Sequence, residues 1–180
     1  MDIEIREGTL EDTPIVAWTV LTALDLLTDD INRFIDICSD PNSMYSWTNS
    51  FIAFVEGRAI GCLIAYDGSR YQQLKAYTWE KLWNDFDKQY LEDMEPETHE
   101  GEFYLDSMAI KPEYRGINIG NLLIDFAIGK AVNLNIPIST LLVDCNKPRL
   151  ETYYKTMGFV ENGHMIFFDH EYIRMKKSTI

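Results

Sequence analysis

The order of the apolar patterns predicts an α/β (α+β) fold, with a mixed central sheet and helices on both of its faces. Strand-like and helical patterns come first, and a β-α-β-α-β succession follows them along the chain. The chain has 180 residues, which is the size of one domain, and 46% of them are apolar. This is enough to bury a substantial core, so we expect a single domain over residues 1–180.

Each element is assigned from its periodicity. Strands show alternating apolar residues or short apolar runs, whereas helices show apolar residues three and four positions apart. Thr9 to Asp12 resembles a capping box at the start of the first helix, and the second helix stops before Pro41. The patterns predict strands at 3–6, 50–55, 59–66, 103–110 and 139–144, two strands between Phe159 and Lys176, and helices at 15–24, at 29–38, from Ile119, and from Pro148 to Gly158.

Residues 70–101 differ in composition from the rest of the chain. They combine aromatic residues with many charges, and eight acidic residues against four basic ones give the segment a net charge of −4. The residues near helical spacing are Leu74, Tyr77, Leu82 and Phe86. We therefore predict a helical acidic insertion over this segment, followed by an acidic loop around Pro96.

The net charge of −13 limits the classes of partner. Nucleic acids and anionic membranes are bound through Lys and Arg, so we expect neither as a partner. An acidic surface attracts cationic partners, although acidity also simply keeps a protein soluble. The N-terminus has no signal-peptide pattern, and no window approaches the ~18 apolar residues of a membrane helix. We therefore expect a cytoplasmic protein.

The cysteines and histidines give no sign of a metal site. Cys38, Cys62 and Cys145 are odd in number and form no C-x-x-C spacing, and the three histidines are not clustered. The cysteines are therefore interpreted as reduced thiols rather than disulfides or metal ligands. We expect no bound metal.

The loop from Arg115 to Gly120 lies directly between a predicted strand and an amphipathic helix. In that position free backbone N–H groups and the positive end of the helix dipole face the same way, which suits an anion. Gly116 and Gly120 let a ligand approach the backbone, Asn118 tolerates a left-handed conformation, and Arg115 is a cation for phosphate oxygens. The alternative is an ordinary β–α turn with an exposed arginine. Other phosphate-binding motifs are absent from the sequence.

The stretch from Leu105 to Gly120 resembles the acetyl-CoA-binding core of the GNAT superfamily of N-acetyltransferases. That core is a strand ending in an apolar-Ala-Val/Ile step, then Pro, then a Q/R-x-x-G-x-G/A loop that opens a helix. Arg115 matches the first loop position and Gly120 the last, whereas Asn118 stands in place of the middle glycine.

A second similarity lies downstream. Asn146, followed by Tyr154 to Phe159, is similar to the Asn…Tyr-x-x-x-Gly-Phe segment of the same superfamily, with a spacing from Asn to Tyr that is one residue longer. The order of elements also agrees with the superfamily along most of the chain, and only residues 70–101 look like an addition.

The resemblance implies a GNAT-like, mostly antiparallel sheet of about seven strands, and direct transfer of an acetyl group from acetyl-CoA to a primary amine. It implies that the pantetheine arm pairs with the strand before the loop, that the pyrophosphate lies on the loop amides, and that a backbone N–H near Met108 holds the oxyanion. The residues implied to bind acetyl-CoA are Met108, Ala109, Ile110, Arg115, Gly116, Ile117, Asn118, Ile119, Gly120, Asn121 and Asn146.

The same resemblance implies a general acid and leaves the base to be found. Tyr154 matches the general-acid tyrosine, with Tyr153 beside it; successive helical residues lie ~100° apart, so only one of them can face the cofactor. Asp106 is the candidate base, because alternation places it on the strand face of Met108, although it could equally be a carboxylate bonded to a neighbour. Glu102 is a second candidate.

The acceptor is the least defined part of the prediction. Trp47, Tyr66, Tyr71 and the aromatic residues of 70–101 could line its site, or the aromatic residues could pack a helix pair. With the acidic surface, they suggest a cationic small molecule or a protein or peptide amine. The alternative function is a non-catalytic acyl-CoA-binding sensor or structural module of the same fold. Dimers are common in the superfamily, so a homodimer is also an expectation.

Overall fold

The computed structural model describes residues 2–26, 31–83, 88–167 and 169–179. Within these ranges seven strands form one sheet in the order β1-β2-β3-β4-β5-β7-β6. β4 and β5 are parallel, and the other neighbours are antiparallel. The predicted fold class is therefore confirmed. The strands are β1 (Ile3–Glu7), β2 (Ser50–Val55), β3 (Arg58–Asp67), β4 (Glu102–Ile110), β5 (Ile138–Asp144), β6 (Val160–Phe167) and β7 (His170–Ser178).

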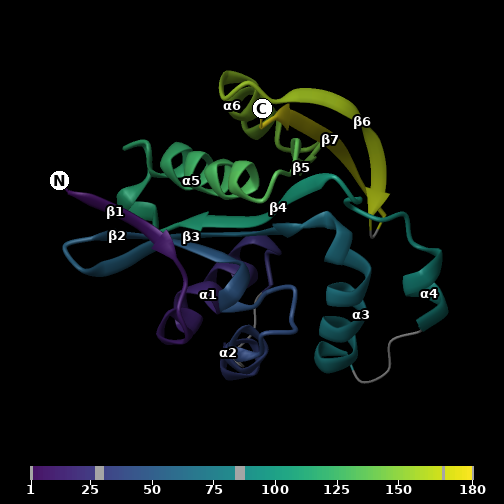
Figure 1. Cartoon of the computed structure of the whole chain (residues 1–180), viewed down its shortest axis with the longest axis horizontal. Helices are drawn as coiled ribbons and strands as arrows, with labels where there is room; N and C mark the ends of the chain where they lie inside the picture. Colours follow the sequence, from purple (N-terminus) through teal and green to yellow (C-terminus); the bar gives the residue numbers. More distant parts are fainter. Residues whose placement is uncertain (1, 27–30, 84–87, 168, 180) are drawn as a thin grey trace.

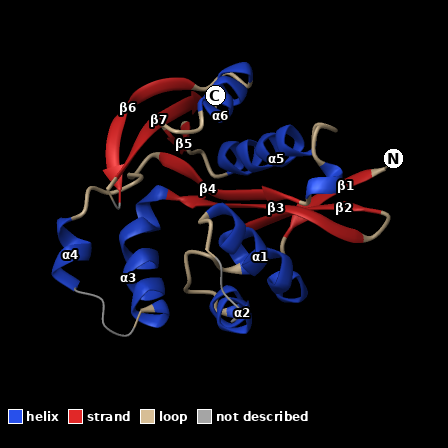
Figure 2. Cartoon of the chain, turned by 180° about the vertical axis from the view of Figure 1, so that it is seen from behind, coloured by secondary structure: helices blue, strands red, loops and turns tan. Residues whose placement is uncertain are grey.

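Helices cover both faces of the sheet, as Figures 1 and 2 show. On one face α1, α2 and α3 enclose one hydrophobic core, and on the other α5 encloses a second, with α6 on the same side. α4 lies beyond α3, at the edge of the molecule (Figure 1). The helices are α1 (Thr13–Ala23), α2 (Ile31–Ser39), α3 (Tyr71–Leu82), α4 (Lys88–Asp93), α5 (Ile119–Asn133) and α6 (Pro148–Thr156).

The predicted start of the first helix is confirmed in detail. Thr9 and Asp12 form a capping box in the turn before α1, where the Asp12 carboxylate accepts from the Thr9 amide at 2.7 Å. Arg6 of β1 pairs with the same carboxylate at 2.7 Å and thereby ties the helix start to the sheet. The predicted opening of the second helix at Asp29–Asp30 lies outside the described residues, as does Phe86 of the 70–101 pattern.

β4 departs from simple alternation at Asp106. Across the β3–β4 ladder Ile64 faces Ser107 and Ala65 faces Leu105, so Asp106 is an extra, unpaired residue, which is a β-bulge. A bulge changes which face the following side chains occupy.

The bulge overturns one prediction about Asp106. Leu105 and Met108 belong to the α5-side core, whereas the Asp106 carboxylate accepts from Tyr66 of the α1–α3 core. The prediction that Asp106 shares a strand face with Met108 and Ile110 is therefore wrong. The bulge arises from the pairing of β4 with β3, which the residues of β4 alone do not reveal.

The central pair of strands separates halfway along its length. β4 and β5 are paired only where Glu102, Phe103 and Tyr104 face residues 138–140. In the described part of the chain, β4 from Leu105 onward has β3 as its only strand partner. The edge of β4 that faces β5 is therefore open at the centre of the sheet.

Candidate active site

Two cavities meet where β4 and β5 separate. The larger, of about 1240 Å³, is lined from the α1–α2 segment, α3, β4, β5, α6 and the β6–β7 hairpin. The smaller, of about 30 Å³, has room for about one water molecule and lies between the two strands on the α5 side. The residues shared by both cavities are Asp106, Met108, Leu142 and Tyr154. These four residues define the junction of the two cavities.

The loop before α5 presents free backbone donors. Gly116 and Asn118 both have positive φ, at 81° and 71°, and Asn118 is the N-cap of α5. Leu122 is the first amide that bonds back into the helix, to the Asn118 carbonyl at 3.2 Å. Among the described residues, the amides of 116–121 have no acceptor. Asn118 thus adopts the left-handed geometry of a glycine, and the helix start suits an anion.

Arg115 leaves most of its guanidinium available at this loop. Its Nε donates to the Ile110 carbonyl at 2.9 Å, and the side chain is exposed. Within the described ranges, its two Nη atoms have no partner. The geometry therefore combines a fixed arginine with a row of free amides, which is a combination that binds phosphate.

The two glycines of the loop have different surroundings. A Cβ on Gly116 would meet nothing within 4 Å, whereas a Cβ on Gly120 would lie 2.7 Å from Tyr153 Oη and 3.6 Å from Met108 Cε. Gly116 therefore leaves the backbone open to a ligand, as the sequence predicts. At Gly120 the space is taken by protein, and this glycine lets α5 approach β4 and α6.

The adjacent tyrosines of α6 take different directions. Tyr153 Oη donates to Asn121 Oδ1 at 2.6 Å and so ties α6 to α5. Tyr154 lines both cavities, and its ring packs against those of Tyr153 and Phe159. Burial raises the pKa of Tyr154 well above its usual value, so it is protonated at neutral pH. Tyr154 is thus the member of the pair that reaches the junction.

Asp106 lies at the junction on the opposite side from the loop. Its carboxylate accepts from Tyr66 Oη at 2.6 Å and from Ser107 Oγ at 2.7 Å. Burial, and then the negative charge of Glu97, raises the pKa of Asp106 from 3.8 to about 7, while these hydrogen bonds and Lys75 act in the opposite direction. Asp106 is therefore both bonded to its neighbours and placed in the cavity.

Beneath the large cavity lies a polar network that the sequence did not reveal. Glu97 accepts from Tyr71 Oη and from Tyr104 Oη, each at 2.7 Å. Lys75 Nζ donates to Tyr71 Oη at 2.7 Å and is only 1% exposed, with three aromatic rings within 5.2 Å. A buried cation and a carboxylate thus act electrostatically on Asp106, and burial lowers the pKa of Lys75.

The remaining candidates lie away from the junction. Glu102 Oε2 accepts from Thr98 Oγ1 at 2.9 Å and from the His99 amide at 3.1 Å, and it lines neither cavity. Asn146 is exposed in the turn after β5 and also lies outside both linings. Of the two carboxylates considered as bases, only Asp106 reaches the junction.

Aromatic residues of 70–101 both line the large cavity and pack in a hydrophobic core. Trp79 of α3 and Trp83, which directly follows α3, line the large cavity, while Tyr71 and Trp79 also belong to the α1–α3 core. Tyr66 lies beneath the cavity through its bond to Asp106. Trp47 lies outside both linings, so its place in the acceptor site stays a prediction.

Comparison with known families assigns the chain to a class. Residues 18–159 match the acetyltransferase (GNAT) family, which is most of the chain. The protein therefore belongs to the GNAT family of acetyltransferases, and the resemblance predicted from its motifs is confirmed. Membership of this family is consistent with acyltransferase activity. A comparison with curated proteins found no match.

Solved structures share the fold over nearly the whole chain. One acetyltransferase superposes with a TM-score of 0.79 at 24% identity, covering 98% of this chain and 100% of its own. An N-acetyltransferase from Staphylococcus aureus Mu50 gives 0.81 at 22% identity, covering 97% and 100%. PaiA N-acetyltransferase from Thermoplasma acidophilum, solved with coenzyme A, gives 0.60 at 16% identity, covering 99% of each chain. These similarities show the fold.

Within the described residues, no helix is both long and apolar enough to span a bilayer.

Proposed function

We propose that the protein transfers an acetyl group from acetyl-CoA directly to a primary amine of a cationic acceptor, which enters through the large cavity. The observation that supports this most is the meeting of Asp106 and Tyr154 at the junction of the two cavities. Asp106 belongs to β4 and Tyr154 to α6, so the two groups come from opposite sides of the separated strands.

The residues present fit acetyl-CoA. The free amides of 116–121 and Arg115 would hold its phosphates, and the open edge of β4 from Met108 to Ile110 would hold its amide-containing arm. Asn121 would contribute its amide, because Tyr153 occupies its side-chain oxygen. When bound, acetyl-CoA would supply an acetyl thioester. Asn146 remains a proposed contact at the margin of this site.

The protein's own residues would move two protons. A lysine-like amine has a pKa of about 10.4 and must lose a proton before it can attack. Asp106, whose pKa is raised to about 7, can accept that proton in its ionised form at Oδ1 or Oδ2. Tyr154 keeps its own proton at Oη and can donate it on the other side of the junction.

The charges around the large cavity favour a cationic acceptor. Two basic residues, Arg33 and Lys147, line the cavity. Four acidic residues line it, namely Asp25, Glu97, Asp106 and Asp144. The volume of about 1240 Å³ is larger than most ligand pockets, which suits an extended polyamine-like molecule or the end of a peptide.

Release of free thiol from acetyl-CoA, measured across a panel of amines, tests the proposal. The panel contains polyamines, aminoglycosides, lysine-containing peptides, peptides with free N-termini, and uncharged amines of matched size. We expect thiol release with the cationic amines and weaker release with the uncharged ones.

Calorimetric titration of coenzyme A is the companion measurement. Binding of coenzyme A without thiol release from any amine would favour the non-catalytic sensor instead. Absence of both would contradict the proposed site itself.

A further inference from the structure

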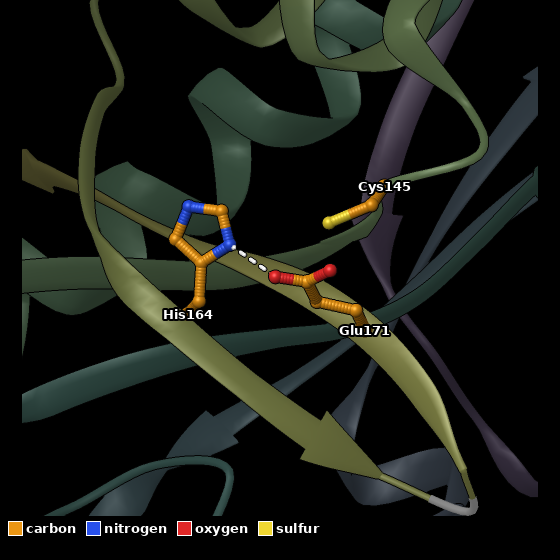
Figure 3. A group of neighbouring side chains, drawn as sticks. All are labelled: Cys145, His164 and Glu171. Atoms are coloured by element: carbon orange, nitrogen blue, oxygen red, sulfur yellow. Dashed lines mark hydrogen bonds and ion pairs between the residues drawn. The ribbon is translucent and has the colours of Figure 1, made fainter.

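Three side chains of metal-ligand type gather on the surface, outside both cavities. Cys145, His164 and Glu171 each offer one ligand atom, and these atoms all lie within 4.8 Å of one another. Figure 3 shows them pointing toward one another from the turn after β5, from β6 and from β7. The sequence predicts no metal site because these residues are far apart along the chain. Folding brings them together.

The backbone fixes the three positions. The Cys145 amide donates to the Glu171 carbonyl at 3.0 Å, which extends the β5–β7 pairing by one residue. On the other side of β7, Glu171 pairs with Ile166 and His164 with Ile173. The ligand-type residues therefore lie on adjacent strands, and their spacing is set by main-chain hydrogen bonds.

The imidazole of His164 is oriented by two carboxylates. Its Nδ1 lies 3.0 Å from Glu171 Oε1 and faces Cys145, while its Nε2 lies 3.0 Å from Glu161 Oε1. A carboxylate on the far ring nitrogen is the arrangement that fixes the tautomer of metal-binding histidines. With a metal bound, Nδ1 would exchange its contact with Glu171 for coordination to the ion. Glu161 is thus a carboxylate outside the proposed ligand set that orients the imidazole of His164.

We propose that Cys145, His164 and Glu171 form a binding site for a divalent transition metal of the Zn²⁺ type. One thiolate sulfur, one imidazole nitrogen and one carboxylate oxygen are a mixed donor set that suits Zn²⁺ and disfavours Mg²⁺ and Ca²⁺, which take oxygen ligands. Zn–S distances of about 2.3 Å and Zn–N distances of about 2.0 Å require the three donors to close by small side-chain movements. The exposure of His164 and Glu171 leaves the fourth position to water.

A bound ion would connect three elements that border the large cavity. Cys145 follows Asp144, and Glu171 lies between His170 and Tyr172; these three neighbours line the cavity, whereas the ligands do not. The ion would therefore hold the end of β5 against the β6–β7 hairpin without entering the candidate active site.

Titration of the full-length reduced protein with Co²⁺ tests the site, because a cobalt–thiolate bond gives a charge-transfer absorption in the near ultraviolet. We expect this band to saturate at one equivalent and to disappear when Zn²⁺ is added. Cys145→Ser should remove the band, and Glu161→Gln should weaken Co²⁺ binding about 10- to 100-fold. His99→Gln, at a histidine outside the cluster, is the matched control and should leave the band unchanged.

Two results would overturn the site. One is the lack of a thiolate band at stoichiometric Co²⁺; the other is a band that persists in Cys145→Ser. Binding with oxygen ligands alone would show only the attraction of an acidic surface for cations. Cys145→Ser should also keep the thiol-release activity on amines, so a failed metal titration is distinguishable from a failed acetyl transfer.

Discussion

At the scale of single residues, the direction of Tyr154 is the clearest feature. It lines both cavities, while its neighbour Tyr153 is bonded to Asn121. The sequence offered both tyrosines, and the resemblance favoured Tyr154. Helix geometry required that one of the two point elsewhere.

Tyr154→Phe should therefore lower kcat by about 100-fold or more, as expected for loss of a general acid, with little change in coenzyme A affinity. Tyr153→Phe is the matched control: it loses one hydrogen bond, about 1 kcal/mol of stability, and keeps most of kcat. Steady-state kinetics, calorimetry and thermal unfolding measure these effects. A larger loss of kcat in Tyr153→Phe would exchange the roles of the two residues.

Asp106 should make activity depend on pH near neutrality. Its pKa of about 7 means that the base form increases as pH rises through 7, so kcat/KM should increase along that limb. Asp106→Asn should lower kcat/KM by about 10²- to 10⁴-fold and abolish the limb. A wild-type profile without an inflection between pH 6 and 8 would argue against this base.

The same pKa has a consequence for stability. Because the pKa of Asp106 is raised in the folded state, ionising this carboxyl opposes folding, and stability is lost as pH rises from about 4 to about 7. Asp106→Asn should therefore raise Tm more at pH 8 than at pH 4.

At the scale of elements, α3 and the loop that precedes β4 set the charge around Asp106. Glu97 raises the pKa of Asp106, and Lys75 lowers it. Glu97→Gln should move the acidic limb of the kcat/KM profile to lower pH, and Lys75→Met should move it to higher pH. Opposite shifts in this pair of variants separate an electrostatic effect from general damage. Shifts in the same direction would contradict it.

Helix α5 depends on close contact at its first turn. A Cβ on Gly120 would meet Tyr153 Oη at 2.7 Å, so Gly120→Ala should displace the helix start and weaken coenzyme A binding. Adding Tyr153→Phe removes the obstructing hydroxyl and should recover part of the affinity. Calorimetry on the two single variants and the double variant measures this coupling. If the losses of coenzyme A affinity in the two single variants simply added up in the double variant, contact with Tyr153 Oη would not be the cause of the Gly120→Ala effect.

The elements show where reading the sequence succeeds and where it stops. Periodicity located the helices and strands, and Asn118 took the left-handed geometry that its side chain tolerates. The bulge at Asp106 was invisible in the sequence because it arises from the pairing of β4 with β3, which depends on the register between two strands. The sequence indicates only that Glu97 belongs to an acidic loop around Pro96, since it is tertiary folding that places it between Tyr71 and Tyr104.

At the scale of the whole molecule, the net charge of −13 and the acidic residues around the large cavity act on the same kind of partner. Salt screens the attraction between exposed charges that lie farther apart than the Debye length, which is about 8 Å at physiological ionic strength. The KM for a dicationic or polycationic amine should therefore rise with added salt, while that for an uncharged amine of similar size should not. Equal salt dependence would remove electrostatic selection of the acceptor.

The short pairing between β4 and β5 has a further consequence. Three residue pairs join the strands β1–β4 to the strands β5–β7. Asp106 belongs to the first group, and Tyr154 follows the first strand of the second. The distance between Asp106 and Tyr154 therefore depends on these three residue pairs, together with the helices packed across them. A substitution far from both groups could misalign them and slow turnover while each retains its own contacts.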